Sequence, residues 1–293
     1  MAERVSVIVN PAAGRGRGAR MVPQIMSAFA EVDVVDVRLT SASRDEAEIA
    51  RHAIDRGATT IIVAGGDGTT THVANAILNS GEDTRLGIIP LGTGNDFAKV
   101  LGSHNQSMKK VARLSVETGN ARVDVGKIED IYFLNCCGFG FDVAVLEATA
   151  RNRYLRGNAV YLYSALRELL GYRGIDLTRN GESMRHLLLV IANTEYFGGM
   201  FRIAPGARPD DGELDLVAIK DVPSGRRVAM LSAATRGEHF KYDECAMERA
   251  ASFTITFPMP PAFESDGELH QAMSSELTVS SCASALRVLT AAN

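Results

Sequence analysis

The sequence predicts two domains: an α/β domain with a parallel sheet over residues 1–122 and an antiparallel β-sandwich over residues 123–293. Three observations support this prediction. The chain has 293 residues, a length typical of about two domains. Short apolar strands alternate with helical periods up to about residue 120, which is typical of a parallel sheet covered on both faces. Beyond that point strands mostly follow one another, as they do in a sandwich.

In the first domain, β-branched and apolar runs predict four strands, at residues 5–9, 32–39, 59–64 and 86–89. Helical periods follow each strand, the last of them over residues 107–118. The helix that starts near residue 45 is expected to have a capping box, with Ser43 capping the first turn and Glu46 reaching back to it.

In the second domain, the predicted strands are residues 123–128, 132–136, 185–193, 214–219, 253–257, 277–279 and 286–289. Two helical regions interrupt them, at residues 143–171 and 224–236. No flexible linker separates the domains near residue 122, and the sequence contains no internal repeat.

The composition excludes several classes of protein. Hydrophobic residues make up 46% of the chain and charged residues 23%, ordinary values that disfavour disorder. The net charge of −4 gives no global sign of nucleic-acid binding. The longest apolar run, Leu187–Ala192, is far shorter than the ~20 residues that span a bilayer, and no signal peptide is evident. A cytoplasmic protein is expected, whose four cysteines are reduced thiols rather than a disulfide framework: Cys136, Cys137, Cys245 and Cys282.

The strongest local motif is the loop Gly65-Gly66-Asp67-Gly68-Thr69, between a strand and a helix. Glycines let a ligand approach the backbone closely, and a helix N-terminus attracts phosphate. A carboxylate beside phosphate requires a bridging cation, and Mg²⁺ binds through one or two carboxylates and phosphate oxygens. The alternative interpretation is a Gly-rich turn with a capping aspartate.

A second loop, Gly92-Thr93-Gly94-Asn95-Asp96, follows the next strand and has the same character. Loops at the carboxyl ends of neighbouring parallel strands converge where open α/β sheets bind ligands. The turn Asn10–Gly14, after the first strand, is expected to form a third edge of the same ligand-binding crevice. The P-loop and dinucleotide spacings are absent, as are the HExxH and GxSxG motifs.

Four segments together resemble the diacylglycerol kinase catalytic-domain family, which includes bacterial lipid kinases and the sphingosine and ceramide kinases. These segments are Asn10–Gly14, Gly65–Thr69, Pro90–Phe97 and Asp266-Gly267-Glu268. They occur in order over nearly the whole chain. The resemblance implies an N-terminal domain like that of NAD kinases and diacylglycerol kinases, which binds nucleotide, and a sandwich that carries the base.

The resemblance also implies the site residues. Glu268 would be the general base, with Asp266 as the next candidate, and Mg²⁺ would be organised by Asp67, Asp96 and Asp124. The ATP-binding residues would be Asn10, Pro11, Ala12, Ala13, Gly14, Thr40, Gly65, Gly66, Asp67, Gly68, Thr69 and Thr93. A second, structural Mg²⁺ would be held by the Asp211 side chain and the backbone carbonyls of Arg208 and Glu213.

One position departs from the family. Its members commonly have Asn-Glu shortly after the GGDGT motif, where this chain has Thr71-His72. If that glutamate belongs to the acidic network, His72 weakens the inference of a metal there. The alternative for His72 is a helix surface residue.

The region Arg151–Arg173 combines five arginines and one glutamate with tyrosines and leucines. Such a basic amphipathic helix suits an anionic membrane surface, although an ordinary helix packed on the sandwich explains it equally well.

Together, the motifs, the resemblance and the basic region lead to one main hypothesis. The protein is expected to be an ATP- and Mg²⁺-dependent lipid kinase, peripheral on the inner face of the membrane, with diacylglycerol as its substrate.

The alternatives are an NAD kinase-like enzyme and a catalytically silent nucleotide- or lipid-sensing module. No nucleic-acid partner is expected. The oligomeric state is left open, a homodimer included.

Overall fold

The computed structural model describes residues 4–30, 32, 34–41, 45–117, 121–151, 169 and 171–290. The chain divides into two compact units, and the first of them is built from both ends of the chain. Unit 1 comprises Met1–Val125 and Ala283–Asn293, and unit 2 comprises Gly126–Cys282.

The sheet of unit 1 is parallel, as the sequence predicts. Its order is β4 (Arg85–Pro90), β3 (Thr60–Gly65), β1 (Val5–Val9) and β2 (Val34–Leu39). β1 and β3 are buried along their whole length, which explains their uninterrupted β-branched and apolar character.

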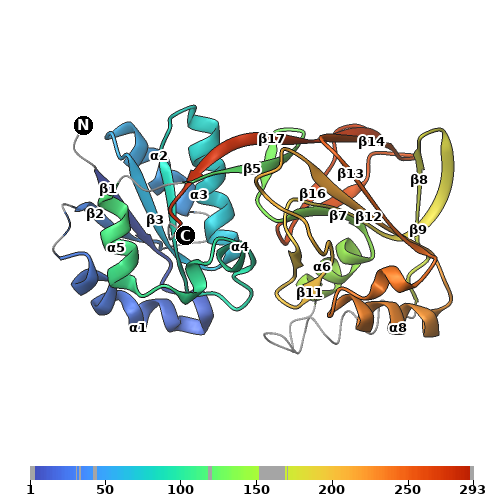
Figure 1. Cartoon of the computed structure of the whole chain (residues 1–293), viewed down its shortest axis with the longest axis horizontal. Helices are drawn as coiled ribbons and strands as arrows, with labels where there is room; N and C mark the ends of the chain where they lie inside the picture. Colours follow the sequence, from blue (N-terminus) through green and yellow to red (C-terminus); the bar gives the residue numbers. More distant parts are fainter. Residues whose placement is uncertain are drawn as a thin grey trace. The chain divides into compact units, whose positions relative to one another are not determined.

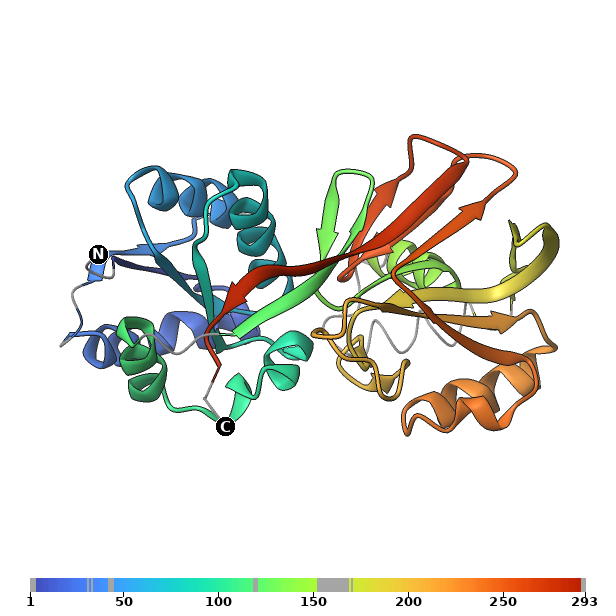
Figure 2. The same cartoon turned by 45° about the horizontal axis from the view of Figure 1, so that its top comes forward.

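Helices cover both faces of this sheet. Figures 1 and 2 show α2 (Asp45–Asp55) and α3 (Asp67–Ser80) on one side, with α1 (Ala13–Ala28) and α5 (Met108–Val116) on the other. Side chains of β1, α1 and α5 share one buried apolar cluster. Ser107 caps α5 by accepting the N–H of Lys110 at 3.3 Å. Two short helices, α4 (Asp96–Val100) and η1 (Ser103–Asn105), follow β4.

The capping box predicted at the start of α2 involves Ser43, which lies outside the described residues. The Glu46 carboxylate contacts His72 of α3. Ser41, four residues before the first residue of α2, donates both its N–H and its hydroxyl to Asp45 Oδ2.

Unit 2 is a β-sandwich of antiparallel strands, as predicted. Among the described residues, the helices α6 (Phe141–Arg151) and α8 (Ser224–Ala234) pack on it. Its strands are β6 (Ile131–Phe133), β7 (Cys136–Gly140), β8 (Ile175–Arg179), β9 (Glu182–Ala192), β10 (Tyr196–Phe197), β11 (Phe201–Arg202), β12 (Leu214–Lys220), β13 (Cys245–Ala250), β14 (Ser252–Thr256), β15 (Ala262–Ser265) and β16 (Glu268–Gln271).

The apolar run Leu187–Ala192 lies in β9 and is buried on both faces. Leu189 and Ile191 point into the cluster shared with β14, whereas Leu187 and Val190 point into a second cluster with residues of α6 and α8. Figure 2 shows α8 alongside the strands β9 and β12. A strand that is covered on both faces has a continuous run of hydrophobic residues rather than an alternation of hydrophobic and polar residues.

Two strands contribute residues to both units. They are β5 (Ala121–Ile128) and β17 (Glu276–Val288), the latter predicted from the sequence as two separate strands. Near its end β17 pairs in parallel with β4, through Val288 and Leu86.

No helix within the described residues is long and apolar enough to cross a membrane. The four cysteines are free, as expected. Most of the basic region Arg151–Arg173 lies outside the described residues.

Candidate active site

The three Gly-bearing loops of unit 1 meet at the carboxyl ends of their strands. Asn10, after β1, donates its side-chain amide to Thr69 Oγ1 at 2.9 Å. Leu91, after β4, donates its N–H to the carbonyl of Gly65 at 2.7 Å. The loops predicted from the sequence to converge are therefore joined to one another at the edge where open α/β sheets bind ligands.

Asp67 connects two of these loops through its carboxylate. Its Oδ2 accepts the N–H of Asn95 at 2.6 Å, and its Oδ1 accepts the N–H of Asp96 at 2.7 Å. These contacts hold Asn95 in the left-handed conformation, with φ of 53°. Asp67 thus has a structural role in addition to the metal-organising role expected from the sequence.

Close backbone approach explains the glycines of the site. A Cβ on Gly92 would lie 2.6 Å from the Cα of Gly66, and a Cβ on Gly14 would lie 2.2 Å from the carbonyl oxygen of Leu91. Gly14 also has φ of +57°, which disfavours other residues. By contrast, a Cβ on Gly68 would meet no atom within 4 Å. Gly66, Gly92 and Gly14 are thus required by the fold of the loops themselves.

The remaining residues expected to bind ATP differ in accessibility. Ala12 and Thr93 are exposed, whereas Thr69 and Thr40 are buried, with 5% and 9% of their surface exposed. Thr69 accepts the Asn10 amide, and the Thr40 N–H donates to the carbonyl of Val9. Thr69 and Thr40 therefore shape the loops, and the exposed residues are the ones open to a ligand.

The other two acids expected to organise Mg²⁺ have protein partners. Lys99 Nζ lies 2.8 Å from Asp96 Oδ1. Asp124 is buried in β5, and its Oδ1 accepts the N–H of Ser284 at 2.7 Å. Among the described residues no three or more acidic, histidine or cysteine side chains gather into a metal-binding group. The arrangement instead fits a cation held by one or two carboxylates and a phosphate ligand.

His72 lies in α3 and is only partly exposed. Its Nδ1 is 2.8 Å from Glu46 Oε1 of α2, and the two side chains are 18% and 6% exposed. The departure from the family motif is thus matched by a carboxylate on the neighbouring helix.

Three exposed arginines beside the first loop were not singled out by the sequence. They follow the glycines of Asn10–Gly18, and within the described chain none forms an ion pair: Arg15, Arg17 and Arg20. Alternation of glycine and arginine was their signal in the sequence. Guanidinium groups suit phosphate oxygens, and these side chains add positive charge beside the loops.

In unit 2, Asp266-Gly267 forms a two-residue hairpin turn between β15 and β16. Asp266 and Gly267 have φ of 47° and 86°, as a type I′ turn requires. The Asp266 carboxylate accepts the N–H groups of Leu134, Asn135 and Cys136 at 2.7 to 3.2 Å. Asp266 is therefore occupied in fixing the turn, and Glu268, which is partly exposed, opens β16 directly after it.

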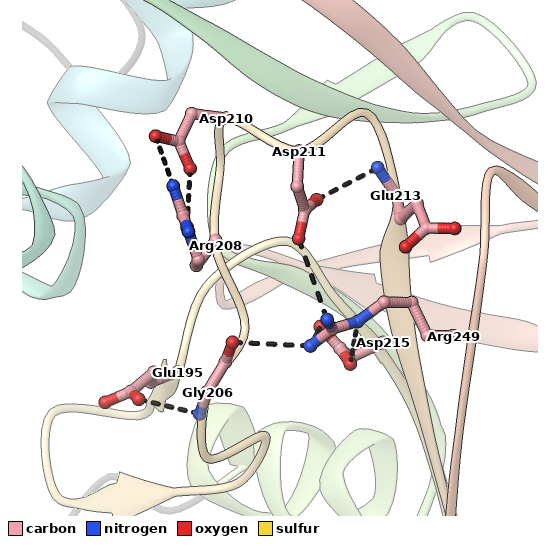
Figure 3. Close-up of polar contacts among 8 residues, drawn as sticks. All are labelled: Glu195, Gly206, Arg208, Asp210, Asp211, Glu213, Asp215 and Arg249. Carbon is pink, nitrogen blue, oxygen red and sulfur yellow. Dashed lines mark hydrogen bonds and ion pairs between the residues drawn. The ribbon is translucent and has the colours of Figure 1, made fainter.

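Figure 3 shows the loop that is expected to hold a structural cation. Asp211 Oδ1 accepts the N–H of Glu213 at 3.1 Å, and Asp211 Oδ2 lies 3.9 Å from Nη1 of Arg249. Within the described chain the carbonyls of Arg208 and Glu213 accept no hydrogen bond. One carboxylate and two carbonyls suit Mg²⁺, but the Arg249 guanidinium already brings positive charge to this loop.

Arg249 also pairs with the buried Asp215, with Nε 3.0 Å from Oδ1 (Figure 3). Burial raises the pKa of Asp215, and the guanidinium opposes that shift. Arg208 pairs with Asp210, and this contact lowers the pKa of the Asp210 carboxyl. The loop is thus an acidic segment that carries its own counter-charges.

The comparisons with known proteins agree with this architecture. Residues 4–128 match the diacylglycerol kinase catalytic domain, and residues 135–290 match the YegS C-terminal NAD kinase beta sandwich-like domain. The chain belongs to the diacylglycerol kinase catalytic-domain family of lipid kinases.

Individual relatives are similar over most of their length. Proteins named diacylglycerol kinase from Bacillus subtilis and Staphylococcus carnosus are each 27% identical, over 91% and 92% of this chain and 90% and 89% of their own. A protein of Chromohalobacter salexigens named "probable lipid kinase YegS-like" is 34% identical over 67% of this chain and 65% of its own. The crystal structure of a diacylglycerol kinase from Bacillus anthracis superposes with a TM-score of 0.75 at 25% identity, covering 99% of this chain and 98% of that one.

Proposed function

We propose that this lipid kinase transfers the γ-phosphoryl group of ATP to the hydroxyl of diacylglycerol and so makes phosphatidic acid. The observation that carries the proposal is the set of three joined loops at the strand ends of unit 1, together with the names of the relatives. Family membership supports the lipid kinase class, and the printed names of the relatives support the choice of diacylglycerol.

The loops supply what phosphate binding requires. Gly66 opens the backbone at the N-terminus of α3, a fourteen-residue helix whose first N–H groups face the loop. Asp67 holds the facing loop through the N–H groups of Asn95 and Asp96. The exposed arginines Arg15, Arg17 and Arg20 add positive charge directly after the first loop.

Glu268 is the proposed general base. The lipid hydroxyl oxygen attacks the γ-phosphorus, its proton passes to the Glu268 carboxylate, and ADP leaves with the electrons of the broken P–O bond. Partial exposure and a rigid hairpin turn before Glu268 support this role. Mg²⁺, when bound with ATP, neutralises phosphate charge. Asp67 and Asp96 are the carboxylates that we propose would hold it.

We further propose peripheral contact with an anionic membrane, through the basic region Arg151–Arg173. Its excess of arginine over acid supports this, since each cation near an anionic surface contributes about 1 kcal/mol. Activity on vesicles should rise with anionic lipid content and fall with ionic strength. Equal binding to neutral and anionic vesicles at low salt would contradict the contact.

The central test is transfer of labelled phosphate from ATP to a panel of lipids in mixed micelles, with NAD as a further acceptor. Label in diacylglycerol supports the proposal, label in another lipid corrects the substrate, and label in NAD alone or in no acceptor overturns the assignment. Glu268→Gln should lower kcat by roughly 10²–10⁴-fold with ATP affinity unchanged. The exposed Glu276→Gln in the same unit serves as the matched control.

A further inference from the structure

Two carboxyl groups meet in the interior of unit 2, and nothing in the proposed reaction uses them. Asp142, in the first turn of α6, is 3% exposed, and Glu264 of β15 is fully buried. Both approach the same face of Gly138 in β7. A Cβ there would lie 1.7 Å from Asp142 Oδ2 and 3.0 Å from Glu264 Oε1. The missing side chain of Gly138 makes the space in which the two carboxyl groups face each other.

The hydrogen bonds of this pair are incomplete. Glu264 Oε2 accepts the N–H of Gly267 at 2.8 Å, and Oε1 lies 3.7 Å from the thiol of Cys136. Asp142 Oδ1 accepts the N–H of Val143 at 2.8 Å, while Oδ2 has no hydrogen-bond partner in the described part of the chain. No basic side chain among the described residues forms an ion pair with either acid.

Two buried carboxylates without a cation cannot both be ionised, because neither charge is solvated and each repels the other. A single proton between them removes one charge and lets the protonated oxygen donate to the other carboxylate. The same physics gives paired carboxyl groups one raised and one lower apparent pKa.

We propose that Asp142 and Glu264 share one proton at neutral pH, and that this pair positions the turn that carries Glu268. The positioning part rests on the proposed function, whereas the shared proton stands on the geometry alone. Glu264 acts through its bond to Gly267, the residue directly before Glu268. Asp142 acts through Glu264, so both are positioning residues and neither contacts substrate.

The electrostatics agree. Burial raises the pKa of Asp142 to about 7, and burial followed by the charge of Asp142 raises the pKa of Glu264. The titratable groups that face the pair are the thiols of Cys136 and Cys137 on β7, the Asp266 carboxylate at the turn and the phenol of Tyr172 beside Gly140. Burial raises the pKa of both thiols and of the phenol, which keeps them neutral, and Asp266 adds only negative charge.

The sign of the pH effect follows. In the unfolded chain both acids titrate near pH 4. Folding raises the pKa of Asp142 to about 7 and also raises the pKa of Glu264. Above pH 4 the folded state therefore binds more protons than the unfolded state, so this contribution to stability is complete below about pH 4 and is lost as the pH rises through about 7.

The test compares the wild type with Asp142→Asn from pH 5 to pH 8. The asparagine amide replaces the shared proton as a donor to Glu264. It should therefore abolish this part of the pH dependence and raise the melting temperature at pH 8 by about 5 °C relative to the wild type. Glu264→Gln should do the same, and Asp243→Asn, at an exposed acid of the same unit, should not.

Two further measurements separate this proposal from the proposed function. Infrared spectra of the wild type at pH 7 should contain the carbonyl band of a buried protonated carboxyl that Asp142→Asn lacks. In lipid phosphorylation, the alkaline limb of the kcat profile should move to higher pH in Asp142→Asn, with KM for ATP unchanged. Identical pH slopes of melting in the wild type and Asp142→Asn, or no infrared difference, would overturn the shared proton. An unchanged kcat profile would overturn the positioning role only.

Discussion

His72 shows how one chain tolerates a departure from its family's motif. Where members of the family commonly have glutamate, the imidazole Nδ1 lies 2.8 Å from Glu46 on the adjacent helix. The pair is largely removed from water, so the contact between the two groups is stronger than it would be on the surface. His72 in α3 is thus paired with an acidic residue, Glu46, in α2.

Restoring the family residue should destabilise unit 1. In His72→Glu, two carboxylates would face each other, and we expect the free energy of unfolding to fall by about 1–3 kcal/mol. The exchange Glu46→His with His72→Glu should recover most of this loss. His52→Glu, exposed on α2, is the matched control. Urea denaturation measures all three, and an equal effect of His72→Glu and His52→Glu would show that the pair does not stabilise the helices.

At this scale, the sequence predicts residue types better than partners. The acid at position 67 and the glycines around it follow from the chemistry of a phosphate loop. That Asp67 accepts the N–H groups of Asn95 and Asp96 does not, since these donors are 28 and 29 residues away. Glu46 has the right spacing for a capping box, but a histidine on the next helix offers it a stronger partner.

At the scale of elements, the loops of unit 1 depend on backbone contact between glycines. Gly92→Ala places a methyl group 2.6 Å from the Cα of Gly66, and we expect a loss of about 1–3 kcal/mol of stability. Gly68→Ala meets no atom within 4 Å and lies in the first turn of α3, so it should be neutral or gain up to about 1 kcal/mol. Thermal denaturation of both variants measures the contrast. Equal stability of the two would contradict the packing of these loops.

Arg249 gives a prediction about metal dependence. Arg249→Gln removes the guanidinium from Asp215 and Asp211, which leaves a buried carboxylate without its partner, and stability should fall by about 1–3 kcal/mol. Asp211 then lacks its nearby cation, so Mg²⁺ should raise the melting temperature of this variant more than that of the wild type. The control is Arg185→Gln, whose exposed pair with Asp176 is remote in sequence from this loop. If Mg²⁺ and a chelator leave the melting temperature of Arg249→Gln unchanged, the loop holds no cation.

Strands were predictable from the sequence where burial is complete. β1, β12 and the C-terminal part of β9 are apolar and buried, and their positions follow from composition alone. β13 was missed because its middle residues are exposed and include Glu248 and Arg249. β15 and β16 were missed because Asp266-Gly267 was interpreted as part of a catalytic motif. Asp-Gly is also a strong signal for a hairpin turn between two strands.

At the scale of the whole molecule, unit 1 depends on the end of the chain. Leu286 and Val288 are fully buried, and Val288 pairs with Leu86 of β4. Leu286→Ala should therefore cost about 2–5 kcal/mol, although the residue is some 160 positions beyond the rest of the unit. Leu39→Ala, half-exposed in β2, is the control. Hydrogen exchange of β3 and β4 should accelerate in Leu286→Ala only, and unchanged exchange would show that β17 does not stabilise the sheet.

The sequence predicts two kinds of domain correctly but not that the last strand returns to unit 1. Hydrophobic periodicity and composition predict whether a segment is a strand, but they do not predict which strand it pairs with. The apolar run at residues 286–289 is compatible with the sheet of either unit. Its assignment depends on long-range pairing, here with β4, for which a single sequence carries no local signal.

This return of β17 has a consequence for biosynthesis. A ribosome delivers the chain from its N-terminus, and domains ordinarily fold in that order. Here the whole of unit 2 is translated before Ala283–Asn293. The Met1–Val125 part of unit 1 therefore cannot pair with its last strand until unit 2 has been synthesised. Until that strand emerges, the edge of β4 that pairs with β17 lacks its partner. The nascent protein should therefore complete its second unit first, and its N-terminal segment is the one that chaperones are expected to hold.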